Sequence, residues 1–187
     1  MKTGLLDILV FSALFVLAAK NAASQTGRLQ ITSWAFGHNQ TIPKEYTCQG
    51  ADVNPPLDIR NIPAGAKSLV LIMDDPDAPM GTWVHWTVWN ITTHITEIPE
   101  SSVPNHAPWD PNSPATPLPA IQGVTSFGRS GYGGPCPPSG THRYFFKLYA
   151  IDTTLTLPSA ASKKALEKAI EGHILDETQL IGLYQKQ

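Results

Sequence analysis

The chain has 187 residues, of which 42% are hydrophobic and 15% charged, so it can build one hydrophobic core and lacks the composition of a disordered protein. Its formal net charge of −2 excludes the basic surface typical of nucleic-acid-binding domains, and we expect no nucleic-acid partner. The 17 prolines favour loops and strand edges over long helices.

The first 24 residues have the pattern of a secretory signal peptide. Lys2 precedes an apolar run from Ile8 to Ala19, and small residues follow up to Ser24. This run of about a dozen residues is shorter than the about 20 that a bilayer-spanning helix needs. We expect cleavage near Ser24/Gln25 and a periplasmic or secreted product, residues 25–187, without a transmembrane segment. An uncleaved anchor helix is the alternative.

Two cysteines, Cys48 and Cys136, lie in the part that would be exported. An oxidising compartment permits a disulfide between them. The sequence leaves both a disulfide and two buried thiols open, because it does not show whether the two Cα atoms lie within bridging distance.

Four segments rich in β-branched, aromatic and aliphatic residues predict strands. They are Leu29–Trp34, Ser68–Met73, Trp83–Ile91 and Arg143–Ile151. A proline-rich stretch at about 99–119, which contains His106 and Trp109, predicts an exposed loop.

Two short helices are expected near the C-terminus. Ser162 can cap a helix over Lys163–Glu171, whose apolar stripe includes Leu166 and Ile170. A second helix is expected over roughly Leu175–Tyr184. Together with the strands, these elements predict one mainly β domain of packed sheets with short C-terminal helices.

Three carboxylates follow the buried strand at Ser68–Met73. Asp74, Asp75 and Asp77 are interrupted by Pro76 and followed by Pro79. Carboxylates are costly to bury without partners, so this segment (DDPDAP) predicts a shaped polar site at the end of the strand. A solvated acidic turn is the alternative.

A histidine on the next strand strengthens the prediction of a site. Strict alternation places His85 on the same face as Trp83, Thr87 and Trp89. An aspartate beside His85 would fix its tautomer and favour its charged form. The alternative is a core histidine bonded to a backbone carbonyl.

The third chemical feature is the segment Gly131–Tyr144, GYGGPCPPSGTHRY. Its glycines and prolines predict a rigid loop whose backbone N–H groups can face a ligand. His142 and Tyr144 follow on one face of a strand. Such donors suit an oxyanion, for example phosphate, carboxylate or sulfate.

Taken in order, DDPDAP, Trp83-x-His85-Trp86 and GPCPPxGTHRY resemble the signature of the phosphatidylethanolamine-binding protein (Raf kinase inhibitor protein-like) family. The segments starting at Ile42 (IPKEYTCQG) and Asn54 (NPPL) resemble its bacterial YbhB/YbcL-like branch. The resemblance covers nearly all of residues 29–185 and implies a β-sandwich with a large antiparallel sheet, a smaller sheet and terminal helices.

The resemblance also implies one ligand pocket, in which family members often have a cis peptide bond before the proline that matches Pro79. The implied ligand-binding residues are Asp75, His85, His142, Tyr144, Trp83, Pro79 and Gly134.

We therefore expect an exported protein that binds a small anion such as phosphate or a phospholipid head group, without catalysis or a cofactor. Regulation of another protein is a further role that the sequence leaves open. Protonated imidazoles would make its affinity rise as the pH falls from about 8 to about 6. One alternative is a protease or kinase inhibitor acting by protein contact. Another is a hydrolase, with Asp75, His85 and His142 as a metal triad or an Asp–His base, although H-E-x-x-H and G-x-S-x-G motifs are absent from the sequence.

Overall fold

The structure is a computed structural model that describes residues 27–102 and 120–187. The expected signal peptide, residues 1–24, lies outside these ranges. So does most of the expected proline-rich loop, including His106 and Trp109.

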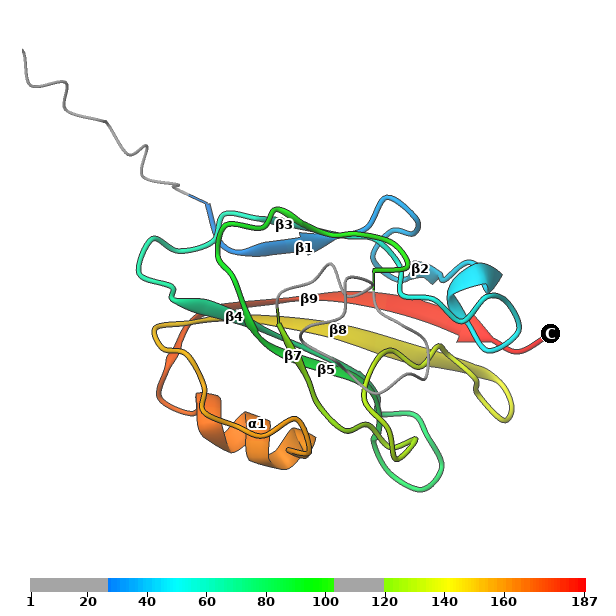
Figure 1. The fold of residues 1–187 in the computed structure, drawn as a ribbon. Helices are drawn as coiled ribbons and strands as arrows, with labels where there is room; N and C mark the ends of the chain where they lie inside the picture. The colour runs from blue at the N-terminus through cyan, green and yellow to red at the C-terminus, as the bar shows by residue number, and fades with distance from the viewer. Residues whose placement is uncertain (1–26, 103–119) are drawn as a thin grey trace, which may run out of the picture.

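Two β-sheets and one helix form three layers (Figure 1). The smaller sheet has the strand order β1-β3-β6, and its strands are β1 (Gln30–Thr32), β3 (Leu57–Arg60) and β6 (Glu97–Ile98). The larger sheet has the order β2-β9-β8-β4-β5-β7. Its strands are β2 (Gln40–Thr41), β4 (Ser68–Asp75), β5 (Trp83–Ile91), β7 (Ile121–Gln122), β8 (Thr141–Ile151) and β9 (Ile174–Gln185).

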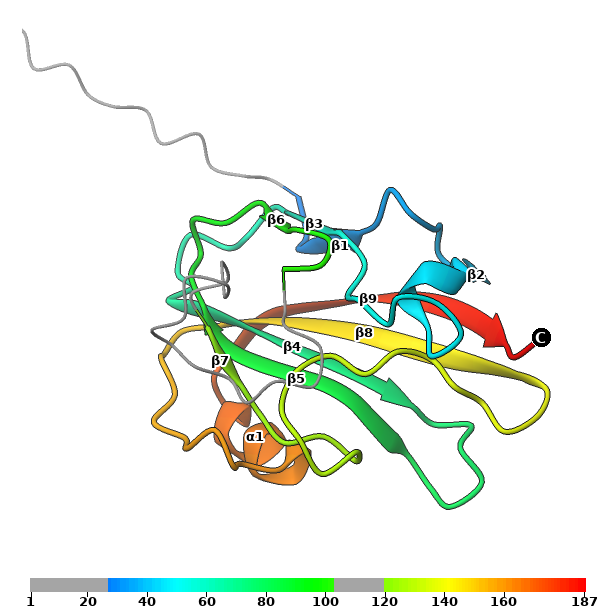
Figure 2. The ribbon, with the colours of Figure 1, turned by 45° about the vertical axis from the view of Figure 1, so that its right-hand side comes forward.

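Neighbouring strands in both sheets are antiparallel, apart from the parallel pair of β2 and β9 at one edge. Figure 2 shows the smaller sheet, with β6 labelled, lying over one face of the larger sheet. The predicted mainly β fold with a large and a small sheet is confirmed.

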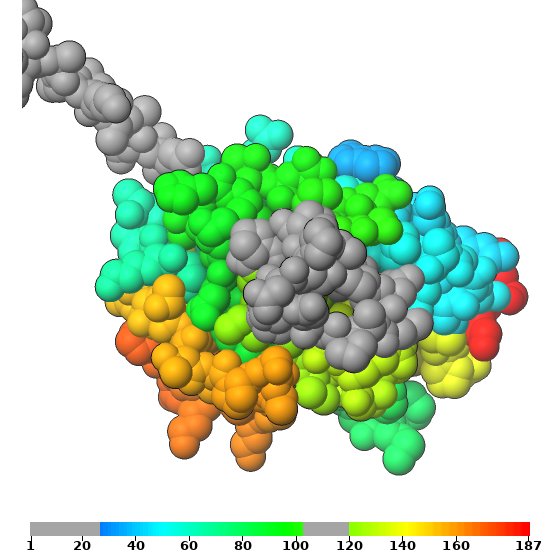
Figure 3. Space-filling model, in the orientation of Figure 1, coloured from blue at the N-terminus to red at the C-terminus, as the bar shows by residue number. Residues whose placement is uncertain are grey.

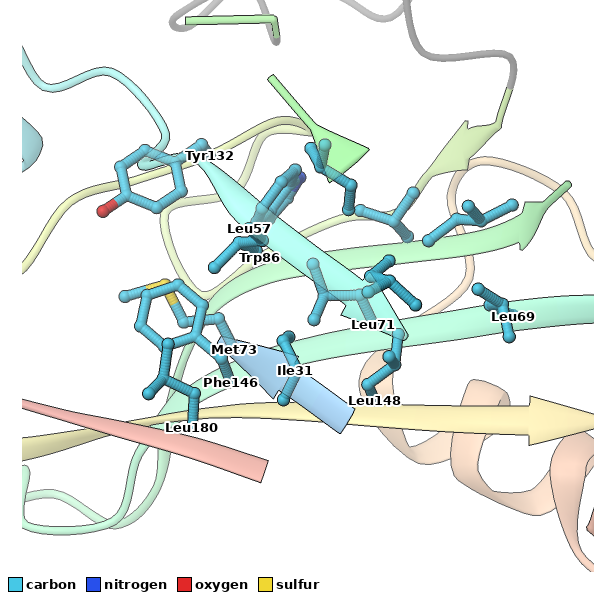
Figure 4. Packing of buried hydrophobic residues seen from close by; sticks show 14 of the residues in the cluster. Ile31, Leu57, Leu69, Leu71, Met73, Trp86, Tyr132, Phe146, Leu148 and Leu180 are labelled. Carbon is cyan, nitrogen blue, oxygen red and sulfur yellow. The ribbon is translucent and has the colours of Figure 1, made fainter. Parts of the chain in front are cut away.

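The main core lies between the two sheets (Figure 4). Leu57 of β3 lies near Leu71 and Trp86 of the larger sheet, and all three side chains are fully buried. Strand β8 alternates in burial, so that every second side chain from His142 to Ala150 faces this core. The core therefore continues along β8 as far as the residues of the predicted site.

The opposite face of the larger sheet is covered by helix α1 (Lys163–Ile170). Its N-cap, Ser162, accepts a hydrogen bond from the N–H of Ala165 through its hydroxyl, at 3.3 Å. Leu166 and Ile170 pack in a second cluster that also contains Trp89 of β5. The first predicted C-terminal helix is confirmed.

The second predicted helix, over Leu175–Tyr184, is wrong. This segment lies in β9, which pairs with β8 along nearly its whole length, from Ile174 opposite Ile151 to Gln185 opposite Thr141. Residues 175–179 have good helix formers, but Leu180, Gly182 and Tyr184 are buried at every second position, which is the period of a strand. Gly182 allows close packing there, because an added Cβ would lie 2.4 Å from Cγ1 of Ile42.

A disulfide joins Cys48, which follows the short 3₁₀ turn η1 (Lys44–Tyr46), to Cys136, which precedes β8. It closes a loop of 88 residues. By the chain-entropy argument such a cross-link destabilises the unfolded chain by about 4–5 kcal/mol. None of the helical segments in the described ranges has the length and apolar character of a bilayer-spanning helix.

Candidate functional site

Strand β4 extends two residues beyond its predicted end, so Asp74 and Asp75 belong to the strand and point to opposite faces of the sheet. Oδ2 of Asp74 lies 2.9 Å from Nζ of Lys147 and 2.7 Å from Nζ of Lys163, on the side of helix α1. Asp75 faces the inner side. The predicted cluster of three carboxylates is therefore divided, and Asp75 is the one that reaches the pocket described below.

The Asp75 carboxylate is only 3% exposed and accepts two hydrogen bonds. Nδ1–H of His142 donates to Oδ2 at 2.7 Å, and the backbone N–H of Asp77 donates to Oδ1 at 2.8 Å. Both carboxylate oxygens are thus held in place, as burial of a charged group requires.

Asp77 fixes the turn after β4 to the start of β8. Arg143 donates to Oδ2 of Asp77 through its backbone N–H and Nε, each at 2.9 Å, and to Oδ1 through Nη2 at 2.7 Å. These bonds from Arg143 lower the pKa of Asp77 from 3.8 to about 2. The expected cis bond before Pro79 is not found: the described residues contain no cis peptide bond.

His85 lies on the inner face of the sheet, and its predicted alignment with Thr87 and Trp89 is wrong. Met73 pairs with Trp86 whereas Asp74 pairs with Val84, so His85 is the extra residue of a β-bulge. Its ring lies edge-on to that of Tyr144, with centroids 5.2 Å apart, within the main core. Trp89 belongs to the other cluster, beneath α1.

The contacts of His85 define its tautomer. Its Nδ1 lies 2.7 Å from the carbonyl oxygen of Gly133, and because a carbonyl oxygen only accepts, Nδ1 carries the proton. Burial lowers the pKa of His85 below 6.5, although the Gly133 carbonyl and Asp75 act in the opposite direction. His85 is therefore neutral at pH 7, and its Nε2 is a hydrogen-bond acceptor. A Cβ at position 133 would lie 2.4 Å from the Phe127 ring, so glycine is required for this approach.

Tyr144 supplies a donor without a partner. The side chain is fully buried, and its hydroxyl makes no hydrogen bond among the described residues. Burial and the nearby Asp75 charge raise the pKa of Tyr144 far above its usual range. The backbone of Cys136 acts in the opposite direction. A buried, unpaired hydroxyl costs free energy, which a ligand acceptor would recover.

A pocket of about 350 Å³ brings these groups together. Five of the seven predicted residues line it, namely Asp75, Pro79, Trp83, His85 and Tyr144. His142 is placed behind Asp75 and is not part of the lining. Gly134 is also outside the lining, because its N–H donates to Oδ1 of Asp52 at 2.6 Å.

The remaining walls were not predicted as site residues. They are Ala78, Met80, Phe127, Cys136, Pro137 and Pro138. Phe127 contacts both Trp83 and His85 edge-on, at 5.4 Å between ring centroids. Its only signal in the sequence is an aromatic residue between Ser126 and Gly128, and such turns are too common to indicate a ligand.

The arrangement does not favour the metal triad. His142 bonds Asp75 and lies outside the pocket lining, whereas Asp75 and His85 line the pocket. Within residues 27–102 and 120–187, no group of three or more His, Cys, Asp or Glu side chains is arranged to hold a metal ion.

Comparison with known proteins shows which family the chain resembles. Residues 32–185 match the sequence model described as phosphatidylethanolamine-binding protein. A UPF0098 protein of Pyrococcus horikoshii is 52% identical over 160 residues, which cover 84% of this chain and 77% of that protein. A UPF0098 protein of Methanothermobacter thermautotrophicus is 45% identical over 158 residues, covering 84% of this chain and 99% of that protein.

Solved structures agree with the sequence matches. A phosphatidylethanolamine-binding protein homologue from Chlamydia trachomatis has a TM-score of 0.76 and 38% identity, covering 86% of this chain and 99% of that chain. YbcL of E. coli, described as a member of the mammalian PEBP family, has a TM-score of 0.76 and 28% identity, covering 86% of this chain and all of that chain. The match to residues 32–185 covers the whole larger sheet, strands β3 and β6 of the smaller sheet and every pocket residue, and the chain belongs to the phosphatidylethanolamine-binding protein family.

Proposed function

We propose that the pocket binds a small oxyanion group, either free phosphate or the phosphate of a phospholipid head group. The observation that carries the proposal is Tyr144, a residue of the pocket lining whose buried hydroxyl has no partner in the described part of the chain. A phosphate oxygen would accept its hydrogen bond. The family's name supports the same class of ligand.

The neutral state of His85 indicates which oxyanions suit the pocket best. Nε2 is the hydrogen-bond acceptor of this ring, because Nδ1 carries the proton and donates it to the carbonyl of Gly133. A free phosphate or phosphomonoester that keeps one proton could donate to Nε2 and accept from Tyr144, whereas the phosphodiester of a phospholipid has no such proton and could only accept. Since the second pKa of a phosphomonoester is about 6, its protonated form predominates below about pH 6.

The proposal is tested by titrating the protein with inorganic phosphate, with phosphoethanolamine and with vesicles containing phosphatidylethanolamine, followed by calorimetry. Binding of all three would indicate recognition of the phosphate group alone, whereas binding of vesicles alone would identify a lipid head group. Tyr144→Phe should weaken binding of the phosphate probes about tenfold, which corresponds to a hydrogen bond of about 1.4 kcal/mol to a charged group.

Tyr149→Phe is the matched control. Tyr149 lies on the same strand as Tyr144, but at an odd-numbered position, so its side chain is on the other face. The control variant should bind phosphate with unchanged affinity. No heat with any of the three probes, or equal losses in both variants, would refute the proposal.

We further propose a binding role rather than a catalytic one. Apart from the Tyr144 hydroxyl, the polar groups of the site are engaged with one another or with the backbone, as in the pair of Asp75 and His142. A nucleophile would need a neighbouring base, and Ser139 and Thr141, which are the nearest hydroxyl residues in this loop, are exposed. Turnover of p-nitrophenyl phosphate that disappears in Tyr144→Phe would contradict this assignment.

Export from the cytoplasm is the last part of the proposal. The apolar N-terminal segment with its small-residue cleavage site supports it. The disulfide between Cys48 and Cys136 also suits an oxidising compartment. Mass spectrometry of the protein recovered outside the cytoplasm should find an N-terminus near Gln25, and an intact Met1 there would contradict cleavage.

A further inference from the structure

The disulfide forms part of the pocket wall. Cys136 lines the pocket together with Pro137 and Pro138, and its partner Cys48 belongs to the segment that follows η1. Both cysteine residues are exposed to solvent. Figure 3 shows the cyan segment that contains residue 48 beside the yellow-green segment before β8, on the right-hand side of the molecule. The bridge therefore lies at the surface of the molecule.

Three hydrogen bonds also join these two segments, but all of them end at or before Pro135. The hydroxyl of Tyr132 donates to the carbonyl of Tyr46 at 2.7 Å. The N–H of Gly134 donates to Asp52 at 2.6 Å, and the N–H of Cys48 donates to the carbonyl of Pro135 at 3.2 Å.

The wall residues 136–138 come after these bonds. Among the described residues, no hydrogen bond or ion pair joins residues 136–138 to the segment of Cys48, whereas the disulfide at Cys136 does. The disulfide therefore helps to hold this part of the wall in position.

We propose that the Cys48–Cys136 bridge is a thiol-exchange site that controls ligand binding in the adjacent pocket; this inference rests on the proposed function. The reactant is a dithiol, either a small molecule or a protein of the dithiol class. Its thiolate attacks one sulfur of the bridge, forming a mixed disulfide, and the other cysteine leaves as a thiolate and takes up a proton. The second thiol of the reactant then displaces the first cysteine.

The exchange balances without a further reactant. Two electrons and two protons pass to the protein, which gains two thiols, and the dithiol becomes a disulfide. Exposed disulfides are more easily reduced than buried structural ones and are the ones with regulatory roles. In the reduced protein the wall at residues 136–138 loses its covalent link, and the pocket no longer holds its ligand in the same geometry.

The test compares the oxidised protein with protein reduced by dithiothreitol and then alkylated, under native conditions. Calorimetry with inorganic phosphate measures affinity, Trp83 fluorescence and the imidazole NMR signal of His85 report the state of the pocket, and circular dichroism reports folding. We expect reduction to lower phosphate affinity about tenfold or more, with changed Trp83 and His85 signals and an intact fold. The variant Cys48→Ser/Cys136→Ser should show the weaker affinity with and without dithiothreitol.

Two results would overturn the inference. One is a bridge that survives dithiothreitol in the native protein but is reduced after unfolding in urea. The other is complete reduction with unchanged phosphate affinity and unchanged Trp83 and His85 signals. If the oxidised protein binds no phosphate probe, the proposed function fails. The exchange site is then tested by whether dithiothreitol reduces the bridge in the native protein and whether reduction changes the Trp83 and His85 signals.

Discussion

Nδ1 of His142 lies 2.7 Å from Oδ2 of Asp75, and both side chains are buried. A second pair of the same type, His173 and Asp152, has nearly the same distance of 2.8 Å but side-chain exposures of 47% and 48%. The two pairs differ in their surroundings and hardly in their geometry. They therefore allow the effect of burial on such a pair to be measured within one protein.

We expect His142→Ala to lower the free energy of unfolding by about 1–3 kcal/mol, because it leaves a buried carboxylate without one of its donors. His173→Ala should change it by less than about 0.5 kcal/mol, as is usual for exposed ion pairs. Urea denaturation followed by circular dichroism measures both. Similar losses of unfolding free energy in the two variants would show that burial does not increase the contribution of the Asp75–His142 pair.

The sequence predicted the sheet strands well where burial follows a simple pattern. The apolar run from Ser68 and the aromatic run Trp83–Ile91 are both observed as strands, the second with the predicted bounds. Five of the eleven pocket residues could also be found, because the motifs that resemble the family contain them, among them Asp75, His85 and Tyr144.

What the sequence missed depends on contacts between distant segments. The bulge at His85 reverses the face that strict alternation predicts, and a bulge has no signature in a run of β-branched and aromatic residues. Strand β9 was mistaken for a helix because the free edge of β8, rather than local preference, decides its conformation. The wall residue Phe127 comes from a loop whose position only the tertiary structure defines.

The assignment of β9 can be tested at Gly182. In a helix, Gly182→Ala would stabilise the protein by about 0.5–1 kcal/mol through helix propensity. In the observed strand, the new Cβ would lie 2.4 Å from Cγ1 of Ile42, and overpacking of this kind costs about 1–3 kcal/mol. We therefore expect destabilisation in urea denaturation, partly rescued by Ile42→Val, which removes Cδ1, the Ile42 atom that would lie 2.5 Å from the new Cβ.

Gly65→Ala provides the control for Gly182→Ala. Its new Cβ would have an ordinary contact of 3.5 Å with Cδ1 of Leu175. The control should leave the midpoint of unfolding nearly unchanged. A Gly182→Ala variant that is more stable than the wild type would contradict the strand.

Two buried tyrosines differ in their hydrogen bonds. The hydroxyl of Tyr132 donates to the carbonyl of Tyr46 at 2.7 Å, whereas that of Tyr144 has no partner among the described residues. Tyr132→Phe should lower the free energy of unfolding by about 1 kcal/mol, and Tyr144→Phe should leave it unchanged or raise it slightly. Thermal and urea unfolding without phosphate give the comparison. A greater loss for Tyr144→Phe would mean that its hydroxyl has a partner in the folded protein.

The link between Asp77 and Arg143 should give the protein part of its acid stability. The folded pKa of Asp77 is about 2, below the ordinary value of 3.8, so the carboxylate stabilises the fold above about pH 4. This contribution is lost as the pH falls from 3.8 to about 2. Because the side chain of Arg143 is 53% exposed, we expect only about 1 kcal/mol from the pair.

Asp77→Asn removes this titration and keeps the size of the side chain. The difference in free energy of unfolding between wild type and variant should be constant above pH 5 and decrease toward pH 2. Guanidinium denaturation at a series of pH values measures it. A difference that stays constant down to pH 2 would exclude Asp77 as the titrating group.

The pH dependence of the pocket should follow His85. Burial lowers its pKa below 6.5, so the folded protein resists protonation that the unfolded chain accepts, and stability is lost as the pH falls below 6.5. A protonated His85 would add a positive charge and a second donor to the pocket. Affinity for phosphate should therefore rise mainly below pH 6.5, at lower pH than the range of about 8 to 6 that an unperturbed histidine implies.

NMR titration of the His85 imidazole, compared with the same resonance in urea-unfolded protein, measures the shift of its pKa. A midpoint above that of the unfolded chain, or phosphate binding that tightens toward high pH, would mean that burial does not control the charge of this imidazole.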